Sequence, residues 1–144
     1  MHAFADAIPR ALARLALTAA ALLAGGLAAG AAPINIELNR LDPAGPNCRA
    51  TIVVQNTEPK PVEGLKIDLV MFDTGGLVAK RLLVDVGSLA RSKTIVKSFE
   101  LGELGCETIG RVLLNDVPAC GAAGAEGCLD AVATSSRTAA PFDK

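Results

Sequence analysis

Apolar side chains alternate with polar ones along most of the chain that follows residue 32. Ile34, Ile36 and Leu38 are separated by single polar residues, and the same pattern returns from Cys48 to Gln55. A period of two, with β-branched residues in short runs, is typical of half-buried β-strands. The pattern predicts strands at residues 34–39, 48–55, 65–72, 77–86, 94–101, 108–116 and 129–134. Outside the N-terminal segment, no window has the period of an α-helix.

Turn-forming residues separate the predicted strands. Residues 41–47 contain two prolines and a glycine, and residues 56–61 contain two further prolines, so both segments oppose regular structure. The segment Asp73-Thr-Gly-Gly76 predicts a hairpin because adjacent glycines admit positive φ. Lys80-Arg81 interrupts the alternation of the fourth strand, and we expect a bulge there.

The second half of the third strand is apolar on both faces. Val70 and Phe72 follow Lys66 and Asp68 on the face that begins as polar. Two-sided apolar character is typical of a central strand. Either a second sheet covers Val70 and Phe72, or the two side chains form an interaction patch. They are therefore the candidate partner-binding residues.

Seven short strands at a spacing of about ten residues, joined by turns, predict an all-β fold. We expect an immunoglobulin-like antiparallel β-sandwich over residues 32–134, with a small barrel as the alternative architecture. In such a sandwich the second and sixth strands run in the same direction in opposite sheets. We expect residues 135–144 to form a loosely attached tail.

The four cysteines form an even set, which predicts two disulfides in an oxidising compartment and allows three connectivities. Cys120 and Cys128 flank a glycine-rich loop that a bridge would close. Cys48 and Cys106 each stand at the start of a predicted strand, so we expect the pairs Cys48–Cys106 and Cys120–Cys128. Their loops correspond to about 4 and about 2.5 kcal/mol of stabilisation. The absence of a Cys-x-x-Cys motif argues against a redox site, and the cysteine spacings of 58, 14 and 8 lack the close pairs of a zinc site.

The first 31 residues have the pattern of an export signal. Arg10 and Arg14 give a positive start, and 18 uncharged residues follow. Small residues precede a cleavage site that we place between Ala31 and Ala32. A retained membrane anchor is the alternative, since 18 residues reach across a bilayer in length. We expect a helical signal peptide, its cleavage, no stable membrane span afterwards, and a periplasmic or secreted protein.

The composition of the chain excludes several classes of binding and catalytic site. Lys plus Arg number 14 and Asp plus Glu 15, so no basic excess exists to hold nucleic acid. Aromatic residues are 3% of the chain, and the single histidine, His2, lies in the predicted signal. A mature chain without histidine excludes Ser-His-Asp and Cys-His catalysis and His-ligated metal sites. We expect no cofactor, no metal and no catalytic residue.

Residues 48–101 resemble the FxLYD-type domain, an immunoglobulin-like module of bacterial extracytoplasmic proteins. The resemblance rests on Asn56, on Val62–Asp73 with its Met-Phe-Asp ending, on Gly75-Gly76, and on the later segment from Val86 to Phe99. It implies an immunoglobulin-like fold outside the cytoplasm.

The chain after the signal also resembles a group of uncharacterised exported proteins of α-proteobacteria, often labelled Tat pathway signal proteins. The similar segments are Leu65–Asp73, Gly110–Val117 and the C-terminal residues 135–144. This resemblance implies an envelope location and supplies no catalytic residues. Arg10 and Arg14 are not adjacent, so the residues themselves leave the export route open between Sec and Tat.

These features favour a non-enzymatic periplasmic module that binds another cell-envelope protein. Two further functions stay open. A small-molecule or ion carrier needs a pocket of roughly several hundred cubic ångströms. A hydrolase that uses carboxylates alone needs two carboxyl groups roughly 5–9.5 Å apart in a cleft.

Overall fold

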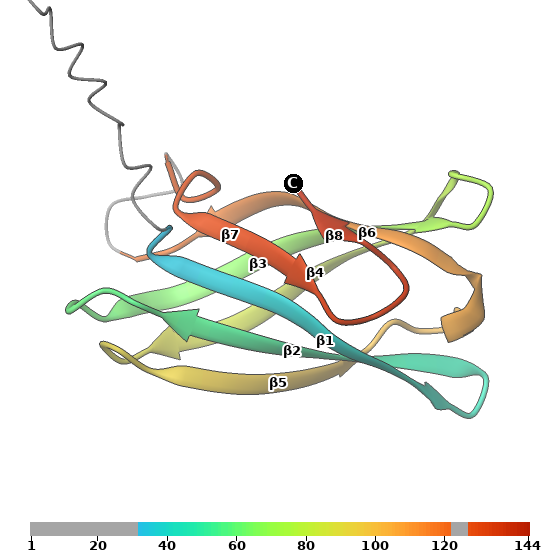
Figure 1. Cartoon of the computed structure of the whole chain (residues 1–144), viewed down its shortest axis with the longest axis horizontal. Helices are drawn as coiled ribbons and strands as arrows, with labels where there is room; N and C mark the ends of the chain where they lie inside the picture. Colours follow the sequence, from blue (N-terminus) through green and yellow to red (C-terminus); the bar gives the residue numbers. More distant parts are fainter. Residues whose placement is uncertain (1–31, 122–126) are drawn as a thin grey trace, which may run out of the picture.

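The computed structural model describes residues 32–121 and 127–144 (Figure 1). The predicted signal, including Ala31, lies outside the described residues, and Ala32 is the first described residue. The described elements are β1 (Ile34–Ala44), β2 (Asn47–Asn56), β3 (Val62–Asp73), β4 (Val78–Leu89), β5 (Thr94–Glu100), a 3-10 turn η1 (Cys106–Thr108), β6 (Ile109–Ala119), β7 (Val132–Ser136) and β8 (Phe142–Asp143). Over these two ranges no helix is long and apolar enough to cross a membrane.

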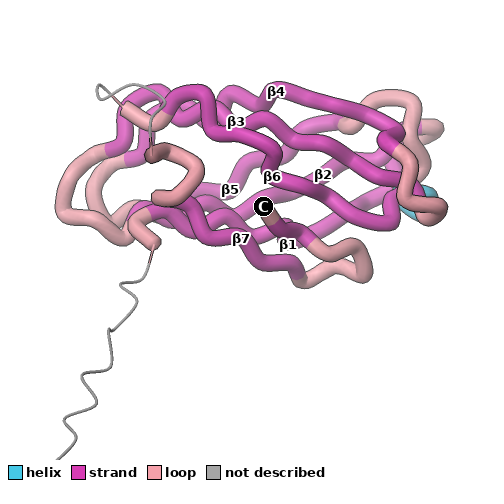
Figure 2. The backbone as a smooth tube through the Cα atoms, turned by 90° about the horizontal axis from the view of Figure 1, so that it is seen from above, coloured by secondary structure: helices cyan, strands magenta, loops and turns pink. Residues whose placement is uncertain are grey.

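The strands form two four-stranded sheets, with the orders β5-β2-β1-β7 and β4-β3-β6-β8. Figure 2 shows them as two packed layers. The prediction of a β-sandwich is therefore confirmed. Most neighbouring strands are antiparallel, as expected, but β7 is parallel to β1 and β8 is parallel to β6. Each sheet thus ends in a short parallel strand from the C-terminal segment, which the expectation of a purely antiparallel sandwich did not include.

Alternate residues of the long strands meet between the two layers. Each inner face is lined by branched aliphatic side chains, and the core includes Ile36, Ile52, Ile67, Met71 and Leu114, all at most 1% exposed. Full burial of one such side chain stabilises the fold by about 1.5–3 kcal/mol. The period-two pattern in the sequence therefore identifies the inward face of each strand correctly.

Both predicted disulfides are present. Cys48 at the start of β2 bonds to Cys106 just before β6, and Cys120 bonds to Cys128 across the β6–β7 connection. The first bridge joins the two sheets, and it places the starts of β2 and β6 at the same end of the sandwich. The expected parallel direction of the second and sixth strands in opposite sheets is therefore confirmed.

Strand β1 runs five residues further than predicted and ends at Ala44. A bulge at Asn39 shifts its register against β2, and the turn is confined to Gly45-Pro46, where Gly45 has a φ of 63°. Pro43 lies inside the strand opposite Cys48. A proline is tolerated in a strand where its missing N–H group is not needed for the ladder. In β4 one register shift leaves Ala79 unpaired, one position before the expected bulge at Lys80-Arg81, and another leaves Val86 unpaired.

The C-terminal segment is firmly packed, so the prediction of a loosely attached tail at residues 135–144 is wrong. The segment completes β7, turns, and inserts Phe142 between the sheets, where the side chain is 6% exposed. The Ser136 hydroxyl donates to the carbonyl of Ala140 at 2.7 Å, and Lys144 Nζ donates to the carbonyls of Leu129 and Val132. One aromatic residue in a polar segment gave no periodic signal from which this packing could be predicted.

Asn56 joins two turns at one end of the sandwich. It is fully buried, and its amide nitrogen donates to the carbonyls of Lys60 at 2.7 Å and Ala90 at 3.2 Å. Its side-chain oxygen accepts from the backbone N–H of Glu58 at 3.0 Å. A buried side chain with both ends bonded holds the β2–β3 and β4–β5 connections together.

Candidate interaction surfaces

The two candidate partner-binding residues lie on the outer face of the β4-β3-β6-β8 sheet. Their neighbours in sequence, Leu69 and Met71, point into the core, and β3 alternates. The second sheet therefore does not cover Val70 and Phe72, and that alternative is wrong. Val70 is nonetheless only 7% exposed, because the outer face itself surrounds it, while Phe72 is half-buried. Of the two candidate residues, Val70 is therefore buried and Phe72 is partly accessible.

Exposed aliphatic side chains flank this pair on the same sheet. Val78 lies opposite Phe72 and is 63% exposed, and Leu83 lies opposite Asp68 and is 58% exposed. Leu113 of β6 lies opposite Val70 and is half-buried. These five apolar residues, which we call the outer strip, are Val70, Phe72, Val78, Leu83 and Leu113. An exposed apolar patch of this kind marks an interaction surface more often than scattered single residues do.

A hairpin with a defined conformation carries one end of the outer strip. Asp73 Oδ1 accepts from the backbone N–H groups of Gly75 at 2.8 Å and Leu77 at 2.9 Å. Gly110 of β6 packs so closely that an added Cβ would lie 2.5 Å from the carbonyl oxygen of Asp73. The hairpin projects beyond the sandwich at the upper right of Figure 1, and Leu77 at its tip is 70% exposed. The backbone of the hairpin thus has little conformational freedom to lose on binding.

A buried carboxylate lies beside the outer strip. Asp68 accepts from Arg81 Nε at 2.9 Å and Nη2 at 2.7 Å, and from Asn115 Nδ2 at 2.7 Å. The hydrogen bonds from Arg81 are the main cause of a lowered pKa for Asp68, against the effect of burial, with further lowering by Asn115 and by the charge of Arg81. The pKa of Arg81 is raised by the same bond. Such a carboxylate stays ionised and is unsuited to donate a proton as a general acid.

Charged pairs border the strip on its β6 side. The guanidinium of Arg111 lies 5.3 Å from the centroid of the Phe72 ring and pairs with Asp143 of β8 at 2.8 Å. An apolar centre with a polar rim is the usual anatomy of a protein–protein interface.

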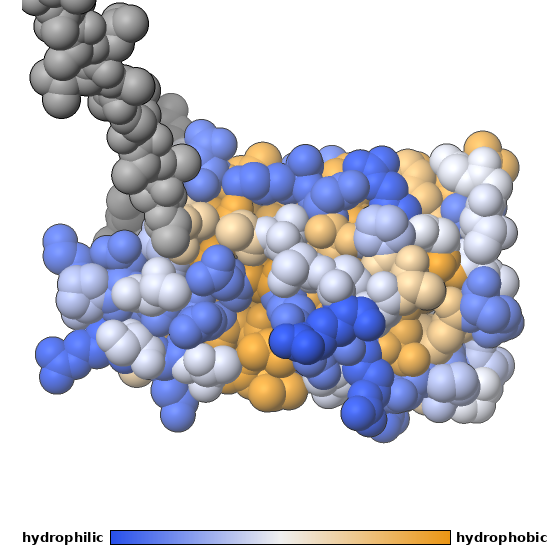
Figure 3. Space-filling model, viewed as in Figure 1, coloured by the Kyte–Doolittle hydropathy of each residue, from blue (hydrophilic) through white to orange (hydrophobic). Residues whose placement is uncertain are grey.

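The outer face of the other sheet is more polar. Figure 3, seen from that side, shows mostly polar and charged residues with an apolar band across the middle. Val96 of β5 is 67% exposed and lies opposite the half-buried Val53. Beside them, the hydroxyl groups of Thr51 and Ser98 lie 2.8 Å apart in a hydrogen bond.

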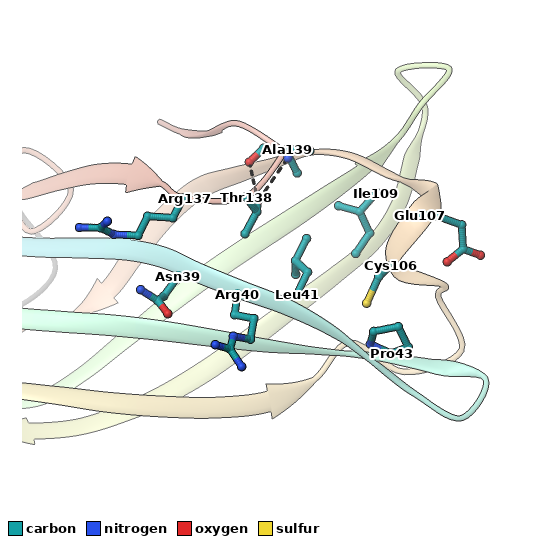
Figure 4. A pocket seen from close by; sticks show the side chains of 11 residues that line it. Asn39, Arg40, Leu41, Pro43, Cys106, Glu107, Ile109, Arg137, Thr138 and Ala139 are labelled. Atoms are coloured by element: carbon teal, nitrogen blue, oxygen red, sulfur yellow. Dashed lines mark hydrogen bonds between the residues drawn. The ribbon is translucent and has the colours of Figure 1, made fainter.

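A groove of about 550 Å³ opens at one side of the sandwich (Figure 4). Its walls are the second half of β1, the β7–β8 connection and the start of β6. Figure 4 shows Leu41 and Ile109 in the space between these walls. The lining residues are Asn39, Arg40, Leu41, Pro43, Cys106, Glu107, Ile109, Arg137, Thr138, Ala139 and Ala140. Sequence reasoning missed the groove because three distant segments form it and none contains a motif.

No protein-family model, curated protein or solved structure matches the chain. The resemblances to the FxLYD-type domain and to the α-proteobacterial group stay predictions. Among the residues that the structure describes, no group of three or more His, Cys, Asp or Glu side chains could hold a metal ion.

Proposed function

We propose that this protein is a non-enzymatic accessory module of the cell envelope that binds another envelope protein through the outer strip. The observation that carries the proposal is the exposure of Val78, opposite Phe72, and of Leu83, opposite Asp68, on a sheet face with a defined hairpin at one end. Two disulfides are consistent with an oxidising compartment outside the cytoplasm. The periplasm is the compartment that we propose.

In-cell crosslinking tests the proposal. A photoreactive residue at Leu83 is compared with one at Val96, which is similarly exposed on the opposite sheet. We expect one envelope protein to be captured from position 83 and not from position 96. The capture should be lost in a Val78→Asp variant that retains its far-UV circular dichroism spectrum. Equal capture from both positions, or none from position 83, would contradict the outer strip as the binding surface.

The groove supports a second candidate function, the carriage of a small molecule. Its volume of about 550 Å³ is within the range of ligand sites, although it is open to solvent. Ala139 is exposed and lines the groove, so Ala139→Trp would fill it without altering the core. A metabolite that raises the Tm of the wild type and not of this variant would support the carrier function. A ligand that raises both equally would place its binding elsewhere.

A further inference from the structure

The second half of β1 presents an open strand edge. Residues 34–38 pair with β2 on one side and with β7 on the other. Beyond Leu38, β1 continues along β2 to Ala44, but in the described part of the chain no strand pairs with its other edge. The groove of Figure 4 runs beside this edge, so the space there is free. An unpaired edge is a template for another strand.

Backbone directions along this edge follow from one hydrogen bond. The carbonyl of Cys48 accepts from the N–H of Leu101, so Cys48 directs its backbone groups away from β1. Because these directions alternate along a strand, the backbone N–H and C=O groups of Arg49 and Thr51 point toward β1. There Arg49 lies opposite Asp42, and Thr51 lies opposite Arg40. Leu41, which lies between those two partners, therefore directs its N–H and C=O groups to the open edge.

The charges on the open edge are self-complementary. In an antiparallel pairing of two such edges about a two-fold axis at Leu41, Arg40 lies opposite Asp42 of the partner subunit, and Asp42 opposite the partner's Arg40. Within one chain, Arg40 and Asp42 are 3.8 Å apart and both side chains are exposed. Both are thus available for pairing with a second copy.

We propose that the protein forms a two-fold symmetric dimer through this edge, with β1 of two copies joined into one eight-stranded sheet. The N–H and C=O groups of Leu41 bond to those of the partner's Leu41, and the two Arg–Asp pairs flank this centre. Because the bulge at Asn39 and Pro43 confine the pairing to the few residues between them, the dimer is weak and depends on protein concentration.

The edge of β5, at the other side of the same sheet, is less suited to this pairing. Lys97 lies opposite the buried Ile52, so its side chain belongs to the inward face, and its Nζ donates to the carbonyl of Val86 at 3.4 Å. An inward-pointing lysine is a known device against edge-to-edge pairing. In β1 the features that oppose edge pairing, the bulge at Asn39 and Pro43 without an N–H group, lie on either side of the Arg-Leu-Asp segment and not within it.

Sedimentation of the exported, purified protein between about 10 μM and about 1 mM tests the dimer. We expect a monomer–dimer equilibrium in the wild type. Arg40→Asp and Asp42→Arg each place like charges opposite one another, and each should weaken dimerisation by about tenfold or more. An equimolar mixture of the two variants restores both opposite-charge pairs and should form a heterodimer.

Arg91→Asp is the matched control. It makes the same charge change at an exposed residue of the β4–β5 connection, which lies at the Ile34 end of β1 and away from the open edge, so dimerisation should be unchanged. A wild type that stays monomeric up to about 1 mM would overturn the proposal. So would single variants that weaken association without recovery in their mixture, since that result would show that the two edges do not pair with each other. The outcome does not depend on the outer strip, which lies on the other sheet.

Discussion

On the outer face of the β5-β2-β1-β7 sheet, polar groups pair with each other at the surface, as in Arg49–Glu100 and Thr51–Ser98. On the outer face of the β4-β3-β6-β8 sheet, the carboxylate of Asp68 is buried under Arg81 and Asn115, and aliphatic side chains remain exposed around it. The two sheets have equal strand numbers and similar inner faces. Architecture therefore does not decide which face can bind a partner.

The two outer faces differ in whether their polar side chains are bonded at the surface or beneath it. Exposed pairs such as Arg49–Glu100 contribute little to stability and keep their face hydrated. Asp68 receives its hydrogen bonds from its own sheet and is already buried, although the Arg81 side chain that pairs with it lies between Val78 and Leu83 and is 67% exposed. Binding over this face therefore does not have to desolvate the carboxylate, which lowers its cost.

The largest expected loss of stability comes from removing the disulfide that joins the two sheets. Replacing Cys48 and Cys106 by alanine removes a bridge with a sequence separation of 58 and should lower the free energy of unfolding by about 4 kcal/mol. The same change at Cys120 and Cys128, with a separation of 8, should cost about 2.5 kcal/mol. Urea unfolding followed by far-UV circular dichroism measures both, since the chain has no Trp or Tyr. Equal losses would show that loop length does not govern the effect.

A second effect follows from removing the C-terminal segment from the β4-β3-β6-β8 sheet. Phe142→Ala should lower the free energy of unfolding by about 3 kcal/mol, because Phe142 packs between the sheets. It should also speed hydrogen exchange of the Val112 amide, which donates to the carbonyl of Pro141 at 2.9 Å. Pro141→Ala, at an exposed neighbouring position, is the control and should change little. An unchanged Phe142→Ala protein would indicate that the segment is loosely held.

The sequence predicts a structural feature when neighbouring residues along the chain determine it. The alternation at Ile34, Ile36 and Leu38 reports burial directly, because strand geometry converts it into one buried face. The disulfide pairs followed from strand starts and loop chemistry. The burial of Phe142 depends on the crossing from β7 to β8, which no neighbouring residue signals.

The prediction of the candidate surfaces is limited in the same way, because it also depends on contacts between distant strands. The face of Val70 and Phe72 was correctly separated from that of Leu69 by alternation. The burial of Val70 could not be predicted, because it arises from Arg81 and Leu113 on neighbouring strands whose register the sequence does not reveal.

The third prediction compares two acidic residues on the opposite faces. Asp68→Ala should lower the free energy of unfolding by about 1–2 kcal/mol, because a buried carboxylate with several hydrogen bonds is lost. Glu100→Ala, whose carboxylate is exposed, should have a much smaller effect. Urea unfolding at pH 7 measures the two variants side by side. A larger loss for Glu100→Ala would reverse the comparison of the faces.

The Asp68 effect should also depend on pH. Its pKa is lower in the folded protein than in the unfolded chain, so the carboxylate stabilises the fold above the unfolded pKa of about 4. This contribution is lost as the pH falls through the folded-state pKa. The stability difference between the wild type and Asp68→Ala should therefore be constant near neutrality and shrink below about pH 4. A difference that grows on acidification would contradict the direction of the pKa shift.

The smallest effect on stability distinguishes the two faces most directly. Val78 and Val96 are the same residue type with nearly equal exposure, 63% and 67%, but only Val78 belongs to the outer strip. Val78→Ser and Val96→Ser should each change the free energy of unfolding by less than about 0.5 kcal/mol, since both are surface positions. Retention on a hydrophobic-interaction column should nevertheless fall more for Val78→Ser, because Val78 belongs to a larger apolar patch that contacts the resin as a unit. Equal shifts in retention would mean that the five residues do not act as one apolar surface. The two faces would then differ only in the burial of Asp68.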